Sequence, residues 1–258
     1  MTEPFELFAF YSDQKRLIDL IDADVDGIII DWESYGKHNR QELFDTQVNE
    51  HGLQDLKTVS LHGPKQIICR VNGPDYLNLQ EIDLAIDNGA TEILVPMIRS
   101  FDQAKSIIDL IKGRVHVSFM IETIEALEIT SELNKLEVKR FFVGLNDLSI
   151  ARGSNSLFIP FIDGTIEKLR PNITKGFGIA GLTHPDSGFP IPCQQLIKVM
   201  KQFKASYGFL RRSFYRDLNK YSIKEIIDAL KAEFQKPENE SAYYLNEKER
   251  SRFNQPLI

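Results

Sequence analysis

Residues 66–122 read QIICRVNGPDYLNLQEIDLAIDNGATEILVPMIRSFDQAKSIIDLIKGRVHVSFMIE. Three short runs in this stretch begin at Gln66, Glu92 and His116 and have apolar residues at successive positions. Such runs are typical of strands that are covered on both faces. The two segments between them have apolar residues three or four apart and end at Asn88-Gly89 and Gly113, as helices do. The stretch therefore predicts parallel strands joined by helices.

The same alternation continues on both sides of this stretch. Eight strand-like runs lie at 7–11, 27–33, 66–72, 92–98, 116–122, 140–147, 176–183 and 207–214. Helical patterns lie between them, at 79–88, 101–112, 123–136, 194–204 and 223–234. The third to sixth runs start about 25 residues apart, which is the length of a strand, a helix and two loops. Eight such units predict a single (β/α)8 TIM barrel.

A doubly wound open sheet is the alternative architecture. It usually carries a Gly-rich phosphate turn after its first strand, and FYSD at residues 10–13 is not such a turn. We expect the barrel to span residues 1–234. A polar break at 235–241 opens a short C-terminal extension, 235–258, which we expect to form an oligomer contact or to fray.

Composition narrows the classes of partner. The chain has 258 residues, of which 42% are hydrophobic and 26% charged, as in one globular α/β domain. A net charge of −6 argues against a nucleic-acid partner. No apolar stretch is long enough to span a membrane and the N-terminus does not read as a secretory signal, so we expect a cytoplasmic protein. Cys69 and Cys193 are expected to be reduced thiols rather than a disulfide.

The chemistry of a TIM barrel lies where the strands run into the loops that follow them. We therefore collect the polar residues at these eight ends as candidate site residues. They are Asp31, Glu33, Arg70, Asn72, Glu122, Asn146, Asp147, Thr183, His184, Arg211 and Arg212.

Glu122 and Asp147 each close an apolar run, on strands that are neighbours in a barrel. Neighbouring strand ends are close enough for two carboxylates to share one Mg²⁺, which fills its other positions with water and substrate oxygens. Either acid also suits the first turn of the following helix. The spacing alone leaves both interpretations open.

Arg70 closes an apolar run as well. Its guanidinium suits either the bidentate binding of anionic substrate oxygens or an ion pair with Asp31 or Glu33. The histidines at 38, 51, 62, 116 and 184 have no second histidine at a metal-ligand spacing, which argues against a histidine-based zinc site. Lys37, His38, Arg40, Arg99, Arg211 and Arg212 are candidates to contact a remote anionic group, or ordinary solvated charges.

Five motifs occur in order along successive strands: GIIIDWE at 27–33, CRVNG at 69–73, ATEILVPM at 90–97, MIET at 120–123 and VGLNDLS at 143–149. Together they resemble the metal-dependent hydroxy-oxo-acid aldolase and citrate lyase β-subunit family of the pyruvate/phosphoenolpyruvate barrel superfamily. The resemblance implies that Glu122 and Asp147 hold Mg²⁺ or Mn²⁺. It also implies that Arg70 contacts the oxo oxygen of the substrate, and we expect Asn146 to assist in substrate binding.

The expected function is that of a divalent-metal-dependent carbon–carbon lyase, an aldolase that cleaves or forms a small 2-oxo acid through a pyruvate-type enolate. One alternative is a short acyl-CoA thioester lyase or hydrolase of the citrate-lyase-like branch. Another is a non-catalytic barrel that retains the metal site. We expect a homo-oligomer with no nucleic-acid or membrane partner.

The general base is where the sequence departs from the family pattern. Ser34 occupies the position at which the aldolase branch has a histidine. Glu33, which shares a strand face with Asp31, is the first candidate base, acting through a water molecule. His184, at the end of the seventh run, is the second candidate, and His38 in the loop after the second run is a further one.

Overall fold

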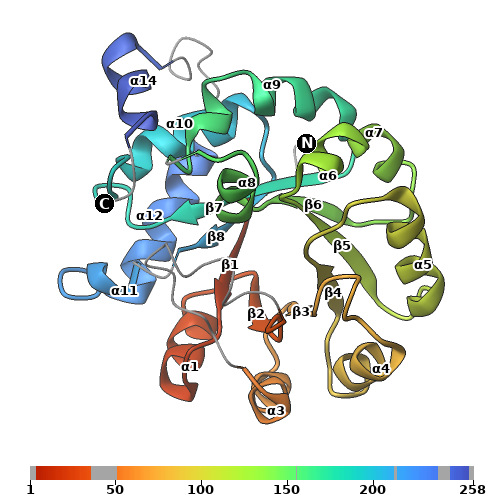
Figure 1. The fold of residues 1–258 in the computed structure, drawn as a ribbon. Coiled ribbons are helices and arrows are strands. Elements are labelled where there is room, and N and C mark those ends of the chain that lie inside the picture. Colours follow the sequence, from red (N-terminus) through yellow and green to blue (C-terminus); the bar gives the residue numbers. More distant parts are fainter. Residues whose placement is uncertain (1–3, 36–50, 155, 212–213, 238–244, 256–258) are drawn as a thin grey trace.

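Eight parallel strands form a closed barrel in the computed structural model, which describes residues 4–35, 51–154, 156–211, 214–237 and 245–255 (Figure 1). The strands are β1 (Glu6–Phe10), β2 (Gly27–Asp31), β3 (Ile67–Arg70), β4 (Glu92–Val95), β5 (His116–Ile121), β6 (Arg140–Val143), β7 (Gly176–Leu182) and β8 (Tyr207–Leu210). Each strand pairs with the next, and β8 pairs with β1 through Tyr207 and Glu6. This closure confirms the predicted (β/α)8 barrel and excludes the open sheet.

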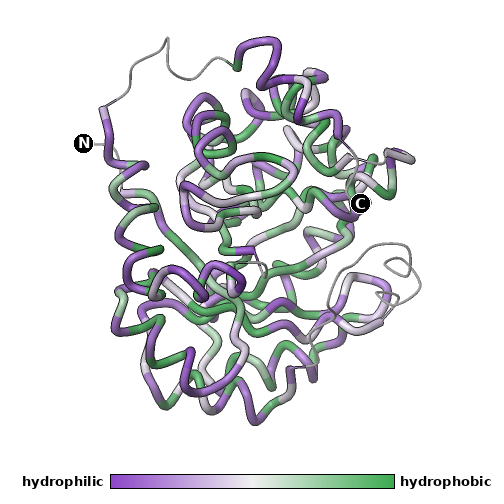
Figure 2. The backbone as a smooth tube through the Cα atoms, turned by 90° about the vertical axis from the view of Figure 1, so that its left-hand side faces the viewer, coloured by the Kyte–Doolittle hydropathy of each residue, from purple (hydrophilic) through white to green (hydrophobic). Residues whose placement is uncertain are grey.

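Helices surround the barrel (Figure 1). In the described ranges the α-helices are α1 (Gln14–Asp22), α3 (Leu53–His62), α4 (Leu79–Asp87), α5 (Phe101–Ile111), α6 (Ile124–Glu128), α7 (Thr130–Leu133), α8 (Leu145–Ala151), α9 (Thr165–Leu169), α10 (Cys193–Gln202), α11 (Phe214–Asp217), α12 (Ile223–Gln235) and α14 (Glu247–Phe253). Two 3₁₀ helices, η1 (Ile159–Phe161) and η2 (Arg170–Asn172), flank α9. Figure 2 shows hydrophobic and hydrophilic stretches alternating along the outer helices, as expected when one face of each helix packs on the barrel.

The helix predicted over 123–136 is divided into α6 and α7. Thr130 lies just after the break, and its hydroxyl donates hydrogen bonds to the carbonyls of Ala126 at 2.7 Å and Leu127 at 3.1 Å. A threonine hydroxyl that bonds the preceding turn competes with the backbone ladder and bends helices. Periodicity alone does not reveal such a break, because apolar spacing continues through it.

Side chains inside the barrel form a compact apolar cluster that includes Ile29, Ile68 and Met120. Successive strand residues point to opposite faces, so the residue two positions later shares the inward direction. For these three residues that position holds Asp31, Arg70 and Glu122, which are all buried. The pleat of the barrel therefore directs these charged groups toward the axis at the carboxyl ends of the strands.

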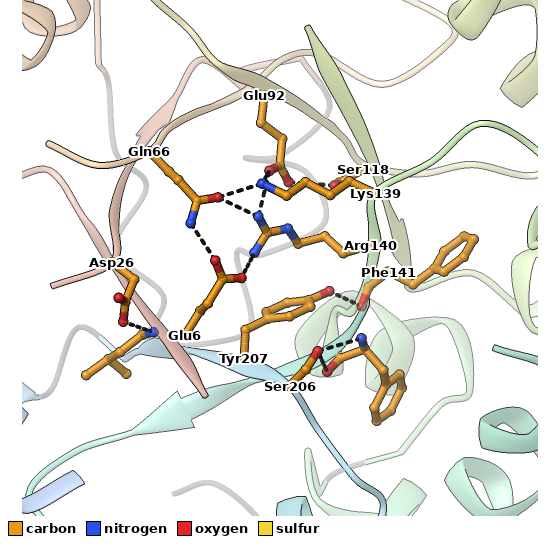
Figure 3. Close-up of polar contacts among 12 residues, drawn as sticks. Glu6, Asp26, Gln66, Glu92, Ser118, Lys139, Arg140, Phe141, Ser206 and Tyr207 are labelled. Carbon is orange, nitrogen blue, oxygen red and sulfur yellow. Dashed lines mark hydrogen bonds and ion pairs between the residues drawn. The ribbon is translucent and has the colours of Figure 1, made fainter. Parts of the chain in front are cut away.

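A separate polar cluster fills the opposite, amino-terminal end of the barrel (Figure 3). At its centre the buried Arg140 bonds Glu6 at 2.6 Å, Gln66 at 2.6 Å and Glu92 at 3.0 Å. Its guanidinium also lies over the rings of Phe8 and Tyr207. This network of paired charges therefore closes the amino-terminal end of the barrel.

Other expectations about the chain have mixed outcomes. Cys69 and Cys193 are both free and buried, which confirms the absence of a disulfide between them. None of the described helices is long and apolar enough to span a membrane.

The tail contains α14 within its described part, 245–255, and this helix packs on the barrel through the buried Phe253 instead of fraying. An oligomer contact by the tail stays a prediction.

Candidate active site

Five of the predicted site residues gather at the carboxyl ends of the strands. Asp31 and Arg70 are the last residues of β2 and β3, and their Cα positions are paired across the two strands. Glu33 and Glu122 follow β2 and β5, and Asp147 lies in the first turn of α8. All five side chains are buried. The barrel thus concentrates four carboxylates and one guanidinium in one place.

Arg70 is held by a bidentate ion pair. Its Nε donates to Asp31 Oδ1 at 2.9 Å and its Nη2 to Asp31 Oδ2 at 2.8 Å, while Nη1 lies 3.4 Å from Glu33 Oε2. Burial acts to lower the pKa of Arg70, but the Asp31 and Glu33 carboxylates raise it above its ordinary value. The ion-pair interpretation is confirmed, and the pairing fixes the plane of the guanidinium at the site.

Glu122 has one satisfied and one unsatisfied carboxylate oxygen. Oε1 accepts the backbone N–H of Met97 at 2.9 Å. Oε2 is buried and has no hydrogen-bond partner. Burial, followed by the neighbouring charges of Asp147 and Glu33, raises the pKa of Glu122 well above its ordinary value. A buried orphan oxygen of this kind calls for a cation or a proton.

The backbone around Glu122 is shaped to this carboxylate. Met97 has a φ of 58°, in the left-handed region that non-glycine residues rarely adopt, and this conformation accompanies its bond to Oε1. At Gly144, a Cβ atom would lie 2.2 Å from Glu122 Oε2. Glycine at this position therefore provides the space in which Oε2 lies. Sequence reasoning missed both residues. Neither the positive φ of Met97 nor the space needed beside Gly144 leaves a local pattern in the sequence.

The helix-cap interpretation has a different outcome for the two acids. Thr123, not Glu122, caps α6, because its hydroxyl accepts the N–H of Ala126 at 3.0 Å. Asp147 does lie in the first turn of α8, where a carboxylate is favoured. Its charge also contributes to the raised pKa of Glu122, so the two carboxylates are close enough to interact.

Asn146, the expected substrate contact, precedes Asp147 in α8. Both its amide nitrogen and its amide oxygen are buried without a hydrogen-bond partner. A buried amide with no partner loses the hydrogen bonds that it makes to water when exposed. Burial of this amide is therefore not compensated by a hydrogen bond within the described residues.

His184 is not brought together with these residues by any contact of the described chain. Its ring stacks on Tyr221 at 3.7 Å, and its Nδ1 accepts the N–H of Asp186 at 3.2 Å. Its own backbone N–H donates to Asp217 Oδ2 at 3.0 Å. These contacts hold the histidine between the loop after β7 and the segment leading into α12.

Asn72 was among the strand-end residues collected, and it links two rim segments. Its side-chain oxygen accepts the backbone N–H groups of Ser34 at 3.0 Å and Tyr35 at 3.1 Å. Its side-chain nitrogen donates to Glu81 Oε1 at 2.9 Å. Ser34 is thus held by its backbone.

His51, which sequence reasoning did not assign, accepts the N–H of Asp31 through Nδ1 at 2.9 Å.

The remaining described candidates contact residues outside this cluster. Arg99 forms an exposed ion pair with Glu125 at 2.9 Å. Arg211 donates to the carbonyl of Phe189 at 3.0 Å, and Thr183 bonds the buried Cys193. Lys37, His38, Arg40 and Arg212 lie outside the described residues.

The carboxylates of this cluster are candidate ligands for a divalent cation. Among the described residues, no group of three or more His, Cys, Asp and Glu side chains is arranged to hold a metal ion. A cation here would have two carboxylate ligands, from Glu122 and Asp147, which is a number that Mg²⁺ accepts and a ligand type that also suits Mn²⁺. The orphan Oε2 and the repulsion between the two acids fit such a cation.

Comparison with known proteins gives structural neighbours only. No protein-family model matches the sequence, and no curated protein is found to be similar to it. A solved HpcH/HpaI aldolase/citrate lyase family protein from Burkholderia cenocepacia J2315 matches 84% of this chain and 91% of its own, with a TM-score of 0.64 and 14% identity. An HpcH/HpaI aldolase from Desulfitobacterium hafniense DCB-2 matches 84% and 90%, with a TM-score of 0.63 and 10% identity.

A citrate lyase from Burkholderia xenovorans LB400 matches 92% of this chain and 78% of its own, with a TM-score of 0.65 and 14% identity. Likeness at such identities establishes the fold only. It does not establish the activity, because one fold hosts many activities. The chain is a (β/α)8 barrel of the type found in these proteins. They carry the same family name that the five sequence motifs indicate, so the resemblance is confirmed at the level of the fold.

Proposed function

We propose that this protein is a divalent-metal-dependent carbon–carbon lyase that acts on a small 2-oxo acid through an enolate. The observation that carries the proposal is the buried, unpartnered Oε2 of Glu122, which lies near Asp147 in a cluster with Arg70. The fold shared with aldolases and citrate lyases supports the same class of reaction. A homo-oligomeric state and a cytoplasmic location stay predictions.

Glu122 and Asp147 would hold the cation. When bound, Mg²⁺ or Mn²⁺ supplies a Lewis acid that stabilises negative charge developing on substrate oxygen. Met97 and Gly144 position the Glu122 carboxylate for this role, through a backbone hydrogen bond and through the absence of a Cβ. The elevated pKa of Glu122 is consistent with a carboxylate that needs a neighbouring positive charge.

Arg70 is the proposed electrophilic partner. Asp31 occupies two of its guanidinium nitrogens, Nε and Nη2, and so orients Nη1. A fixed donor of this kind stabilises an enolate oxygen without a cost in reorganisation as the charge appears. The unpartnered amide of Asn146 is the proposed second contact, and it offers a donor and an acceptor to the substrate.

Glu33 is the proposed base. Cleavage requires a proton to leave the substrate hydroxyl as the carbon–carbon bond breaks, and a base must reach it directly or through one water. Glu33 is buried and lies 3.4 Å from Arg70 Nη1, so its carboxylate is in the cluster. His184 is a weaker proposal, because its observed contacts are with Tyr221 and Asp186.

The test combines metal binding with turnover on a panel of hydroxy-2-oxo acids and short acyl-CoA thioesters. Chelation is expected to abolish cleavage of the oxo acids and Mn²⁺ to restore it, while Glu122→Gln and Asp147→Asn bind Mn²⁺ weakly and stay folded. Equal turnover with and without metal contradicts the proposal. Cleavage of thioesters alone favours the acyl-CoA alternative, and Mn²⁺ binding without turnover favours the non-catalytic barrel.

The base is tested by comparing Glu33→Gln with His184→Asn. Glu33→Gln is expected to suppress cleavage but to retain part of the exchange of pyruvate methyl protons, because Arg70 and the metal ligands remain. Both rates are measured by NMR in deuterated water. Normal cleavage by Glu33→Gln removes Glu33 as the base.

A further inference from the structure

The C-terminal helix is anchored on the loop that follows Asp147. α14 has only 7 residues, yet Phe253 at its end is 0% exposed. The Phe253 ring meets Phe158 and Phe161 edge to face, with centroids 6.1 Å apart in each case. An isolated helix of this length is not stable in water. Its order therefore comes from this aromatic contact and the polar contacts around it.

Three polar contacts join the helix to the barrel. Ser156 Oγ donates to the carbonyl of Phe253 at 2.6 Å, and so satisfies a carbonyl of the last turn, which has no partner within a helix. Arg250 donates to the carbonyl of Ile162 at 3.1 Å. Glu249 pairs with Lys198 of α10 at 3.0 Å. Two of these contacts fall on the segment between α8 and α9.

A chain of hydrogen bonds leads from Ser156 back to α8. The N–H of Ser156 donates to Ser154 Oγ at 3.2 Å. The N–H of Ser154 donates to the carbonyl of Ser149 at 2.9 Å, and Ser149 Oγ donates to the carbonyl of Ser154 at 2.7 Å. Ser149 is part of α8 and lies two residues after Asp147. The far end of the helix that carries Asp147 is thus tied to the C-terminal helix.

We propose that Phe253 and Ser156 are positioning residues for the divalent cation site, because they hold α8 so that Asp147 stays beside Glu122. The inference rests on the proposed function, in which these two acids bind the metal. A cation shared by two carboxylates requires both to keep their relative positions, so the segment that carries Asp147 has to be held in place. α14 provides this restraint by covering the segment between α8 and α9.

The experiment uses full-length Phe253→Ala and Ser156→Ala. Leu230→Ala, in the buried face of α12, is the control for lost apolar burial, and Lys248→Ala, exposed on α14, is the control for the helix surface. Mn²⁺ dissociation constants are measured by titration calorimetry. Amide hydrogen exchange over α8 is measured in the metal-free proteins, and melting temperatures show that each variant is folded.

Phe253→Ala is expected to weaken Mn²⁺ binding about 10-fold or more, as loss of a residue supporting a metal ligand does, and to speed exchange over α8. Ser156→Ala has the same effects to a smaller degree, and Phe253→Leu recovers most of the affinity. Leu230→Ala lowers the melting temperature without either effect. Unchanged affinity in a folded Phe253→Ala protein, or a loss equal to that of Leu230→Ala, overturns the proposal.

Hydrogen exchange separates this proposal from the proposed function. Wild-type protein that binds no Mn²⁺ overturns the metal site, and the exchange rates then decide whether α14 restrains α8. Unchanged exchange over α8 in Phe253→Ala overturns the restraint, whatever the metal affinity.

Discussion

Glycine at position 144 has no side chain, and this makes room for the Glu122 carboxylate. A Cβ at Gly144 would lie 2.2 Å from Glu122 Oε2 and 2.8 Å from Glu122 Cβ. The φ of Gly144 is −84°, which alanine adopts readily, so Gly144→Ala acts through this clash and not through backbone strain. We expect Gly144→Ala to weaken Mn²⁺ binding about 10- to 100-fold. Calorimetric titration measures this.

Gly52→Ala is the matched control for this prediction. A Cβ there would have its nearest neighbour at 3.9 Å. The control is expected to bind Mn²⁺ like the wild type. Gly144→Ala with wild-type affinity would mean that Glu122 Oε2 is not a ligand.

The same carboxylate predicts how the stability of the metal-free protein depends on pH. Burial, with Asp147 and Glu33, raises the pKa of Glu122 well above its ordinary value of 4.5. The folded state therefore retains a proton that the unfolded state loses, so the free energy of unfolding falls as the pH rises from 4.5 through the raised pKa. The slope is about 1.4 kcal/mol per pH unit for one group. Denaturant titrations across this range measure it.

Glu122→Gln removes the titrating group, and we expect its stability to lack this slope. Saturating Mn²⁺ is expected to reduce the slope in the wild type, because the cation displaces the proton. An identical slope in wild type and Glu122→Gln would assign the effect to another group.

At the scale of elements, the sequence was sufficient to predict the strands and most of the charged cluster. Parallel barrel strands all end at one rim, so the polar residue that closes each apolar run, such as Arg70 or Glu122, is expected at this rim. His184 satisfies the same rule but packs on Tyr221. The rule places a residue at the rim but does not determine its neighbours, because these depend on the loops.

Asn72 connects two such loops, and its loss is expected to destabilise the rim. Asn72→Ala leaves the N–H groups of Ser34 and Tyr35 and the half-buried Glu81 without a bond that they now make. Ser34 and Tyr35 are exposed, so water can replace these bonds, and the net loss of a hydrogen bond costs about 0.5–1.5 kcal/mol. The free energy of unfolding is therefore expected to fall by about 1 kcal/mol. Urea unfolding measures the loss. Asn88→Ala, at an exposed amide after α4, is the control, and an equal effect of both variants would contradict the role of Asn72.

Contacts across the whole molecule are the part that the sequence could not predict. Glu6 and Arg140 are 134 residues apart, and Ser156 and Phe253 are 97 apart. No local pattern marks such partners, because each is chosen by barrel closure and not by its neighbours along the chain. The same applies to the docking of α14, whose single buried aromatic, Phe253, gives little periodic signal.

The two ends of the barrel are expected to respond independently to substitution. At the amino-terminal end, Arg140→Met leaves the buried Glu92 and the part-buried Glu6 without their guanidinium partner. Breaking a buried ion pair from one side typically costs about 3–5 kcal/mol. We therefore expect a loss of that order in the free energy of unfolding, with Mn²⁺ affinity unchanged, because the proposed cation site is at the opposite end.

The double variant Arg140→Met/Glu92→Gln separates a lost attraction from an uncompensated charge. Removal of the Glu92 charge is expected to recover part of the stability, since the buried Glu92 of the single variant keeps only the more distant Lys139, at 3.4 Å, to compensate its charge. Chemical denaturation and Mn²⁺ titration are run on both variants. If the folded single variant lost Mn²⁺ binding as Glu122→Gln does, the ends would be coupled through the apolar interior. That outcome would contradict a barrel in which one end stabilises the fold and the other carries the chemistry.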